Sequence, residues 1–250
     1  MGNPRRLYSK TGPIRFPNIC KTPSLAPKHD KLYVGSVEVG NGSAAAMRVG
    51  WGYELPDTAW IAGYSTLTTF TDDTTDAQDA GAYDFMLANK DVANSGFVVA
   101  ATQPFNLIGV TLSNAAATAG TVYYQYSNGT AFSNLTMVTT GAMNATPGDI
   151  YFMFLKPHDF APFTAAVGGV PAGNYAFRAV FSTAPTTTSP LATELWVCNL
   201  VDYVESCDAG KSILWDSGGD VRLPTNLGLV AYAATADAEN WVNIEYTEGP

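Results

Sequence analysis

Short β-rich runs, each followed by turn-forming residues, recur along the chain from residue 31 onwards. Residues 32–39 alternate apolar and polar side chains, and Asn128-Gly129, residues 146–148 and residues 171–173 supply tight turns. No segment has the period of a long amphipathic helix. The spacing therefore predicts an all-β fold, an antiparallel sandwich or jelly-roll-like module. The predicted strands are 32–39, 47–53, 96–101, 105–112, 121–126, 132–138, 149–155, 174–181, 195–200, 212–215, 227–233 and 241–246.

The first 31 residues form a basic, proline-rich segment. They hold seven basic residues and one acid, which leaves six basic and 21 acidic residues for 32–250. Prolines recur too often for a helix or a central strand, which predicts an extended arm. A basic arm on an acidic body favours docking on an acidic surface. An arm that wraps its own domain, or a loose basic tail, would have the same composition. The prolines are Pro4, Pro13, Pro17, Pro23 and Pro27.

Composition narrows the class of partner. Only 14% of residues are charged, against about 25% in an ordinary soluble domain, which suits a protein that buries outer surface against partners. The excess of 21 acidic over six basic residues in 32–250 predicts that the body repels nucleic acid. No apolar h-region and no run of about 20 apolar residues is present, so we expect no targeting segment, no membrane partner and assembly in a cytoplasm.

Three segments are predicted from these patterns. Residues 1–31 form the arm, residues 71–197 form the sandwich module, and residues 32–70 together with 198–250 form a flanking β lobe. The two flanks are grouped because each is β-rich and too short to stand alone.

The sequence contains no recognisable catalytic motif, and we expect no enzyme activity, no cofactor and no metal. His29 lies in the arm and His158 in a turn, so a His-based triad is not indicated. The acidic segment 72–84 is a loop or short helix start, with calcium binding as the less favoured alternative. A glycosidase needs only two carboxylates and stays the least favoured alternative. Cys20, Cys198 and Cys207 are expected to be reduced thiols, with a Cys198–Cys207 bridge as the alternative.

Five motif pieces follow one another through the central module. They are Gln103-Pro104-Phe105-Asn106-Leu107, residues 123–132 (YYQYSNGTAF) with Leu135-Thr136, Gly148-Asp149-Ile150-Tyr151-Phe152, Pro157-His158-Asp159-Phe160 and Gly173-Asn174-Tyr175-Ala176-Phe177-Arg178. In this order they resemble a β-sandwich module of bacteriophage virion proteins, including capsid decoration (cement) proteins and fibre or appendage proteins. Phe132 and Phe160 stand where Trp is commoner in that module. The resemblance covers about half the chain.

Large side chains of these pieces are predicted to close the sandwich. Arg178 is predicted to pair with Asp149 or Asp159 as a structural pin, and the run 150–155, which does not alternate, is predicted to be covered on both faces. The predicted structural residues are Tyr124, Tyr126, Phe132, Phe160, Tyr175, Phe177 and Arg178.

The resemblance implies a structural virion protein. The short length, the N-terminal arm and the lack of a long fibrous segment favour a place on the capsid surface. We therefore expect the chain to bind across major capsid subunits and to stabilise the phage head, together with copies of itself as a dimer or trimer. The alternative is a tail, fibre or neck component, which could bind host glycans through its five Trp residues, although core packing is the favoured role for each Trp. The predicted capsid-binding residues of the arm are Arg5, Arg6, Tyr8, Lys10, Ile14, Arg15 and Phe16.

Overall fold

The structure is a computed structural model, and most of the residues that it describes are in β-strands. It describes residues 6–8, 14–15, 19–21, 31–81, 85–116, 121–144, 146–185, 188–224, 229–234 and 237–249. Within these ranges the helices are α1 (Thr74–Gln78) and the 3-10 turn η1 (Asp57–Ala59). The predicted all-β class is confirmed. No helix in the described ranges is long and apolar enough to cross a membrane.

The chain divides into two compact units. Unit 1 combines Met1–Glu54 with Leu200–Pro250, and unit 2 is the continuous segment Leu55–Asn199. These limits differ from those predicted, because β6 (Trp60–Ser65) pairs with β9 (Ser95–Ala101), which places residues 55–70 in unit 2. The strand β16 (Leu191–Cys207) contributes its residues up to Asn199 to unit 2 and the rest to unit 1.

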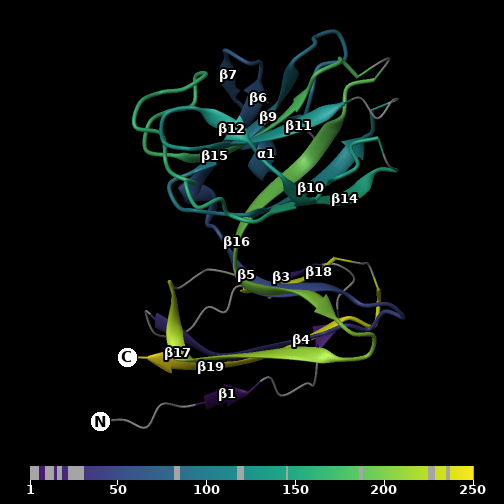
Figure 1. Cartoon of the computed structure of the whole chain (residues 1–250), viewed down its shortest axis with the longest axis vertical. Coiled ribbons are helices and arrows are strands. Elements are labelled where there is room, and N and C mark those ends of the chain that lie inside the picture. The colour runs from purple at the N-terminus through teal and green to yellow at the C-terminus, as the bar shows by residue number, and fades with distance from the viewer. Residues whose placement is uncertain are drawn as a thin grey trace. The chain divides into compact units, whose positions relative to one another are not determined.

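Unit 1 is built from two antiparallel sheets (Figure 1). One sheet has the order β1–β19–β4–β17, with β2 also on β19, and the other runs β3–β18–β5 and then the last part of β16. The bounds are β1 (Arg6–Tyr8), β2 (Ile14–Arg15), β3 (Ile19–Lys21), β4 (Lys31–Gly40), β5 (Met47–Glu54), β17 (Ser212–Pro224), β18 (Leu229–Ala233) and β19 (Trp241–Gly249).

Both sheets of unit 1 send side chains into one core. Val37 of β4 and Val242 of β19 meet Trp51 of β5 and Ala231 of β18 in a single buried cluster. Each of the two sheets thus buries one face against the other, which makes unit 1 a sandwich. Each fully buried Val side chain stabilises the fold by about 1.5–3 kcal/mol relative to an exposed one.

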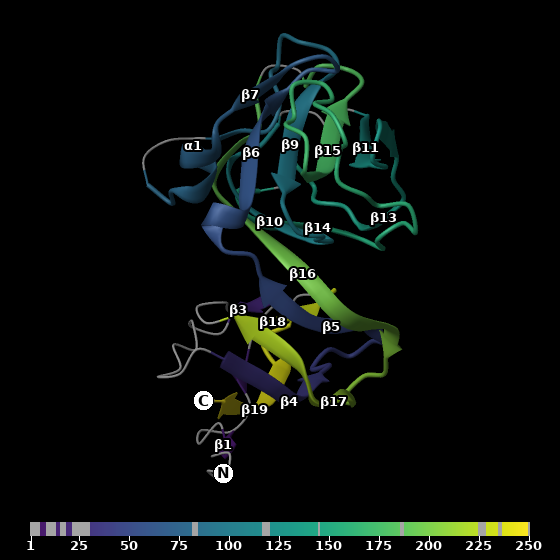
Figure 2. The same cartoon turned by 90° about the vertical axis from the view of Figure 1, so that its left-hand side faces the viewer.

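Unit 2 is a second sandwich. One sheet has the order β12–β11–β15–β9–β6–β7, and the other has the order β13–β14–β10–β16 with β8 also on β16 (Figure 2). The ring of Phe97 on β9 lies 5.6 Å from that of Phe152 on β14, so side chains of the two sheets meet in the core. The remaining bounds are β7 (Phe70–Asp72), β8 (Phe85–Met86), β10 (Leu107–Asn114), β11 (Val122–Ser127), β12 (Phe132–Asn134), β13 (Met137–Thr139), β14 (Gly148–Phe154) and β15 (Tyr175–Phe181).

The outer face of the β9 sheet is covered as well. Val98 and Ala100 of β9 point away from Phe97 and pack with Phe163 and Val170, which lie in the loop after β14. All seven residues of β9 are buried for this reason. The strand is therefore a continuous apolar run that does not alternate.

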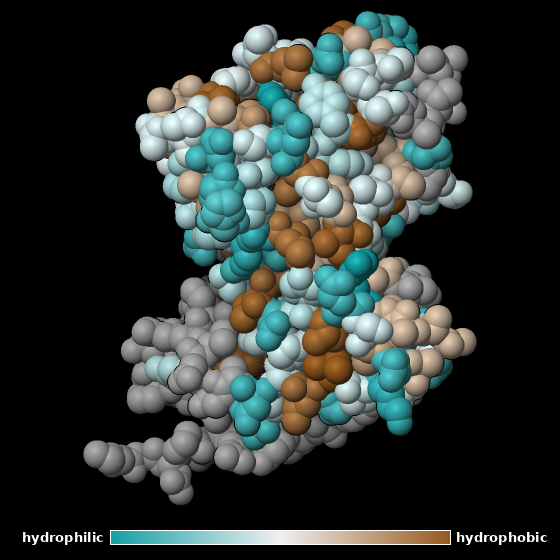
Figure 3. Space-filling view, in the orientation of Figure 1, coloured by the Kyte–Doolittle hydropathy of each residue, from teal (hydrophilic) through white to brown (hydrophobic). Residues whose placement is uncertain are grey.

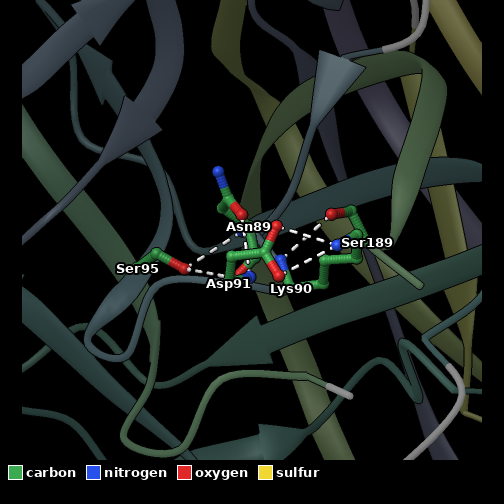
Figure 4. Close-up of polar contacts among 5 residues, drawn as sticks. All are labelled: Asn89, Lys90, Asp91, Ser95 and Ser189. Atoms are coloured by element: carbon green, nitrogen blue, oxygen red, sulfur yellow. Dashed lines mark hydrogen bonds and ion pairs between the residues drawn. The ribbon is translucent and has the colours of Figure 1, made fainter. Parts of the chain in front are cut away.

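Polar side chains fasten the loop between β8 and β9 in unit 2 (Figure 4). The hydroxyl of Ser95 accepts from the backbone N–H of Asn89 at 3.0 Å and donates to the backbone carbonyl of Asn89 at 3.2 Å. The Lys90 amide donates to Ser189, and the Lys90 ammonium pairs with Asp91 at 2.8 Å. These contacts satisfy backbone groups of a loop that contains no regular ladder.

Several strands differ from the sequence prediction. The run 132–138 is not one strand: β12 and β13 belong to different sheets, and the chain crosses between them at Leu135-Thr136. The strands β6, β7 and β8 were not predicted. The run 150–155 is buried on both faces at Phe152 and Met153 as predicted, whereas Leu155 is 42% exposed. The jelly-roll order of strands remains a prediction.

Three strands lie within the predicted arm. Arg6–Tyr8 and Ile14–Arg15 pair with β19, and Ile19–Lys21 pairs with β18. These strands lie at sheet edges, where a neighbouring proline removes no ladder hydrogen bond. The arm that was predicted to be extended therefore adds backbone to both sheets of its own unit.

Deletion of residues 1–30 is expected to destabilise unit 1 while unit 2 stays folded. The deletion exposes the backbone edges of β19 and β18, and long unpaired edges promote aggregation. Differential scanning calorimetry of the full and the truncated chain would show one transition moving to lower temperature. An unchanged pair of transitions would contradict the edge-covering role.

Candidate functional site

Aromatic side chains of five motif residues gather in the core and at one end of unit 2. Tyr124 stacks on Phe177, with ring centroids 6.1 Å apart and an interplanar angle of 25°. Tyr126 and Tyr175 both contact Phe160, at 6.2 and 5.1 Å. Such ring pairs add about 0.5–1.5 kcal/mol each beyond the burial of their area. Phe160 follows β14 in a loop, so these contacts fix that loop against the strands.

Phe132 and Arg178 lie on the opposite face of the same sheet. The ring of Phe132 packs edge-on against Phe163 at 5.0 Å, and the Arg178 guanidinium carbon lies 3.9 Å from the centre of the Phe132 ring. The predicted aromatic and Arg residues therefore form two groups, because alternate residues of a strand point to opposite faces.

The predicted partner of Arg178 was wrong. Its guanidinium donates from Nε at 2.9 Å and from Nη2 at 2.5 Å to Gln125 Oε1, and from Nη1 at 3.2 Å to the Leu67 carbonyl. Asp159 accepts instead from Tyr126, and Asp149 accepts from Thr111. Arg178 is 5% exposed, and burial lowers its pKa. Arg178 is thus a buried cation that contacts neutral acceptors and one aromatic ring. It connects β15 with β11 and with the turn before β7.

A pocket of about 270 Å³ opens in unit 2 beside Tyr126. Its lining comes from β11, from β12 and β13 with the crossing between them, and from the residues after β14. Leu155, which is 42% exposed, contributes an apolar side chain to the wall of the pocket. The pocket lies slightly below the range of about 300–1,000 Å³ typical of small-molecule sites. The lining residues are Tyr126, Asn134, Leu135, Thr136, Val138, Leu155 and Pro157.

A hydrogen bond holds Tyr126, one of the residues that line this pocket. The Tyr126 hydroxyl donates to Asp159 Oδ1 at 2.7 Å, and this hydrogen bond, followed by burial and the charge of Asp159, raises the pKa of Tyr126. His158, the neighbour of Asp159, has a side chain that is 98% exposed. The pocket therefore presents an apolar wall with a fixed phenol and two further polar side chains, Asn134 and Thr136.

The remaining apolar surface is scattered. In the view of Figure 3, hydrophobic patches on both units are separated by hydrophilic residues. The exposed large apolar side chains among the described residues are Leu67, Leu155, Val201 and Leu214, of which Leu214 is 63% exposed. Single exposed apolar residues are ordinary, so the pocket beside Leu155 is the more informative feature.

The Trp residues are not exposed stacking platforms. Trp51, Trp60 and Trp196 are at most 6% exposed. Trp196 lies directly over Gly109 of the neighbouring strand β10, where a Cβ atom would come within 1.8 Å of the indole ring. Trp215 packs against the core of unit 1, and Trp241 lies over Gly40. Packing, the favoured role for these residues, accounts for all five.

The predicted capsid-binding residues fall only partly within the described chain. Arg6, Tyr8, Ile14 and Arg15 lie in the edge strands β1 and β2. Arg5, Lys10 and Phe16 lie outside the described residues, as does His29.

The acidic segment begins the helix α1. Asp72 Oδ1 accepts from the Thr74 backbone N–H at 3.0 Å and from the Thr74 hydroxyl at 2.6 Å, which is a local Asx turn just before the helix. Burial, followed by the charge of Asp76, raises the pKa of Asp73. Within the described residues no group of three His, Cys, Asp or Glu side chains is arranged to hold a metal ion. Asp84 lies outside them.

The two described cysteines are buried free thiols. No Cys198–Cys207 bridge forms, as the favoured interpretation expected. Cys20 lies in β3. Burial raises the pKa of Cys207.

Comparison with protein-family models, with curated proteins and with solved structures found no match for this chain.

Sequence reasoning missed the two acceptors of Arg178 and the pocket. Gln125 alternates with Tyr124 and Tyr126 and pairs in register with Arg178, so a correct strand pairing would have found it. The Leu67 carbonyl and the pocket depend on where loops fold back, and no local pattern marks them.

Replacement of Arg178 by Met is expected to destabilise unit 2 by about 1–3 kcal/mol, because Gln125 and the Leu67 carbonyl lose their donor. Urea unfolding measures the change. Lys90→Met is the matched control: its ion pair is at the surface, and a change within about 0.5 kcal/mol is expected. Equal effects of the two variants would contradict the role of Arg178.

Alkaline pH is expected to weaken unit 2. Burial raises the pKa of Tyr124 to about 12, and burial with the charge of Asp149 also raises that of Tyr151. The unfolded state loses these protons first, so the free energy of unfolding falls as pH rises from about 10 towards 12. Urea unfolding across this range should show a shallower fall for Tyr124→Phe. An identical pH dependence would refute the contribution of Tyr124.

Proposed function

We propose that this chain is a structural protein of a bacteriophage particle, a capsid decoration protein that binds across major capsid subunits and stabilises the head. The ordered motif pieces of the central module support this proposal, as does the charge-poor composition. The observation that carries it is the division of the chain. An acidic sandwich, Leu55–Asn199, is inserted as one segment into a unit whose sheet edges bear the basic arm.

Unit 2 and the arm also differ in charge. Leu55–Asn199 holds ten acidic and three basic residues, whereas residues 1–31 hold seven basic and one acidic residue. Complementary charge speeds encounter with an acidic shell surface and sets orientation.

The mechanism of stabilisation is thermodynamic linkage. A protein that binds only the intact shell lowers the free energy of that state, and the gain grows with the ratio of free concentration to the dissociation constant. Contacts that bridge neighbouring capsid subunits oppose their separation. A stable contact of this kind buries on the order of 1,000 Å² or more.

One observation favours a second candidate function. The pocket beside Tyr126 combines an apolar wall with the polar side chains of Asn134 and Thr136. A tail, fibre or neck component could use such a pocket for one unit of a host surface glycan.

Co-sedimentation with empty heads of the phage that encodes the chain tests the first candidate. Saturable binding at on the order of hundreds of copies per head is expected for a protein that follows the symmetry of the shell. No binding, or a handful of copies per head, would overturn the proposal. Binding to host polysaccharide that Leu155→Asp abolishes would then support the second candidate.

A further inference from the structure

The strand β12 forms an open edge of its sheet in unit 2. It stands at the end of the order β12–β11–β15–β9–β6–β7, and no other strand of the described ranges pairs with its outer side (Figure 1). Across the ladder to β11, Leu135 donates its backbone N–H to the Tyr124 carbonyl at 2.8 Å. Bonded and non-bonded residues alternate along an antiparallel ladder, so Phe132 and Asn134 turn their backbone N–H and C=O groups away from β11. These groups are donors and acceptors for a further strand.

The edge of the other sheet on this side, formed by β13, is less suited to pairing. The register of β13 against β14 shifts between Met137 and Thr139, so Val138 lies opposite no residue of β14. Such a bulge bends an edge strand and interrupts its ladder. The pairing of β12 with β11 has no register shift. The regular edge of β12 is therefore the one that an added strand can follow.

The pocket of about 270 Å³ lies at the end of this edge. Asn134, the last residue of β12, lines it together with Leu135 and Thr136, the two residues that follow. Leu135 and Tyr126 lie on one face of the ladder, since Leu135 comes two residues after Ser133, the register partner of Tyr126. A residue that an added strand places opposite Leu135 has its side chain on that same face, and therefore at the pocket.

The size and the lining of the pocket suit one large aliphatic side chain. Its volume lies below the range of about 300–1,000 Å³ that is typical of small-molecule sites. Val138, Leu155 and Pro157 add apolar groups to that of Leu135. A side chain that covers the exposed part of Leu155 removes apolar surface from water. Extended segments bind sheet edges in this way: backbone hydrogen bonds give affinity, and pockets for alternate side chains give specificity.

The charge of unit 2 favours a basic segment. Leu55–Asn199 holds ten acidic and three basic residues, and Arg178, one of the three, is 5% exposed. Asp159, which accepts from the hydroxyl of the pocket residue Tyr126 at 2.7 Å, has a side chain that is 42% exposed. This carboxylate attracts a cationic side chain near the pocket and repels an acidic one.

We infer that the outer edge of β12 binds an extended basic peptide segment of a partner protein, which adds a strand to the sheet and places a large aliphatic side chain in the pocket. The inference does not rest on the proposed place in a phage head. It assigns the pocket to a peptide instead of the glycan of the second candidate function. Because β12 has three residues, the added ladder is short, and the side chain in the pocket supplies much of the selectivity.

An NMR titration of the isotope-labelled full chain tests the inference. The probe is the peptide acetyl-Lys-Thr-Thr-Leu-Thr-Thr-Lys-amide, and the expected result is a shift of the backbone amide signals of Phe132, Asn134 and Thr136. Three control peptides replace Leu by Gly, replace both Lys by Glu, or carry a methyl group on the backbone nitrogens of the Thr residues that flank Leu. Each control is expected to bind about tenfold more weakly or worse, because it lacks the apolar side chain, the charge or the ladder donors.

A matched pair of protein variants locates the binding site. Leu155→Asn is expected to weaken binding of the probe peptide by about tenfold, because the pocket loses an apolar side chain. Leu214→Asn, at the 63% exposed Leu of unit 1, should leave binding unchanged. Equal effects of the two variants would place the peptide elsewhere and overturn the inference.

Other outcomes of the titration overturn it as well. Undiminished binding of the methylated peptide would show that no strand is added at the edge. A response to N-acetylglucosamine without one to the peptide would favour the glycan. No response to the peptide at millimolar concentration would exclude this site for a peptide, whatever the outcome for binding to heads.

Discussion

A β-sheet that does not close on itself ends in strands with unpaired backbone groups, and covering those edges is the constraint on which unit 1 depends. The edges of β19 and β18 are covered by strands of three, two and three residues from the basic arm. Because these contacts are backbone ladders, the arm can tolerate its prolines and still complete both sheets. The segment that was predicted to be an extended arm is therefore part of the fold of unit 1, which agrees with the alternative of an arm that wraps its own domain.

In unit 2, side chains and loops cover a sheet face rather than a sheet edge. The loop after β14 lays Phe163 and Val170 over the outer face of β9, while Phe160 closes the aromatic cluster from the other side. Arg178 lies where the sheet meets the turn before β7, and its donors reach Gln125 and the Leu67 carbonyl. A buried cation satisfied by neutral groups holds its position through geometry, since each of its acceptors would be left without a donor if it moved.

Local patterns predicted most strands of the sandwiches but not which strands share a sheet. The runs that became β4, β9, β15 and β19 alternate or are continuously apolar, which is why they could be recognised. The run 132–138 has one uninterrupted β-forming composition, yet the chain changes sheets at Leu135-Thr136, and only tertiary pairing decides that. The strands β1 to β3 escaped recognition because prolines suppress the signal of a central strand and permit an edge strand.

The candidate site was less predictable than the fold. The predicted aromatic residues pack against other rings. The partner of Arg178 was assigned by charge, whereas its acceptors are the Gln125 side-chain amide oxygen and the Leu67 carbonyl. The pocket beside Tyr126 arises where four segments meet, so its lining residues share no spacing in the sequence.

The place of the chain in a virus particle is the central claim, and counting its copies tests that claim most directly. Phage particles purified from a lysate that contains the chain would be separated into heads and tails, and the chain would be quantified in each fraction by mass spectrometry against the major capsid protein. The account predicts that it accompanies the heads at on the order of hundreds of copies per particle, in fixed ratio to the capsid protein. Recovery with tails at a few copies, or absence from the particle, would contradict it.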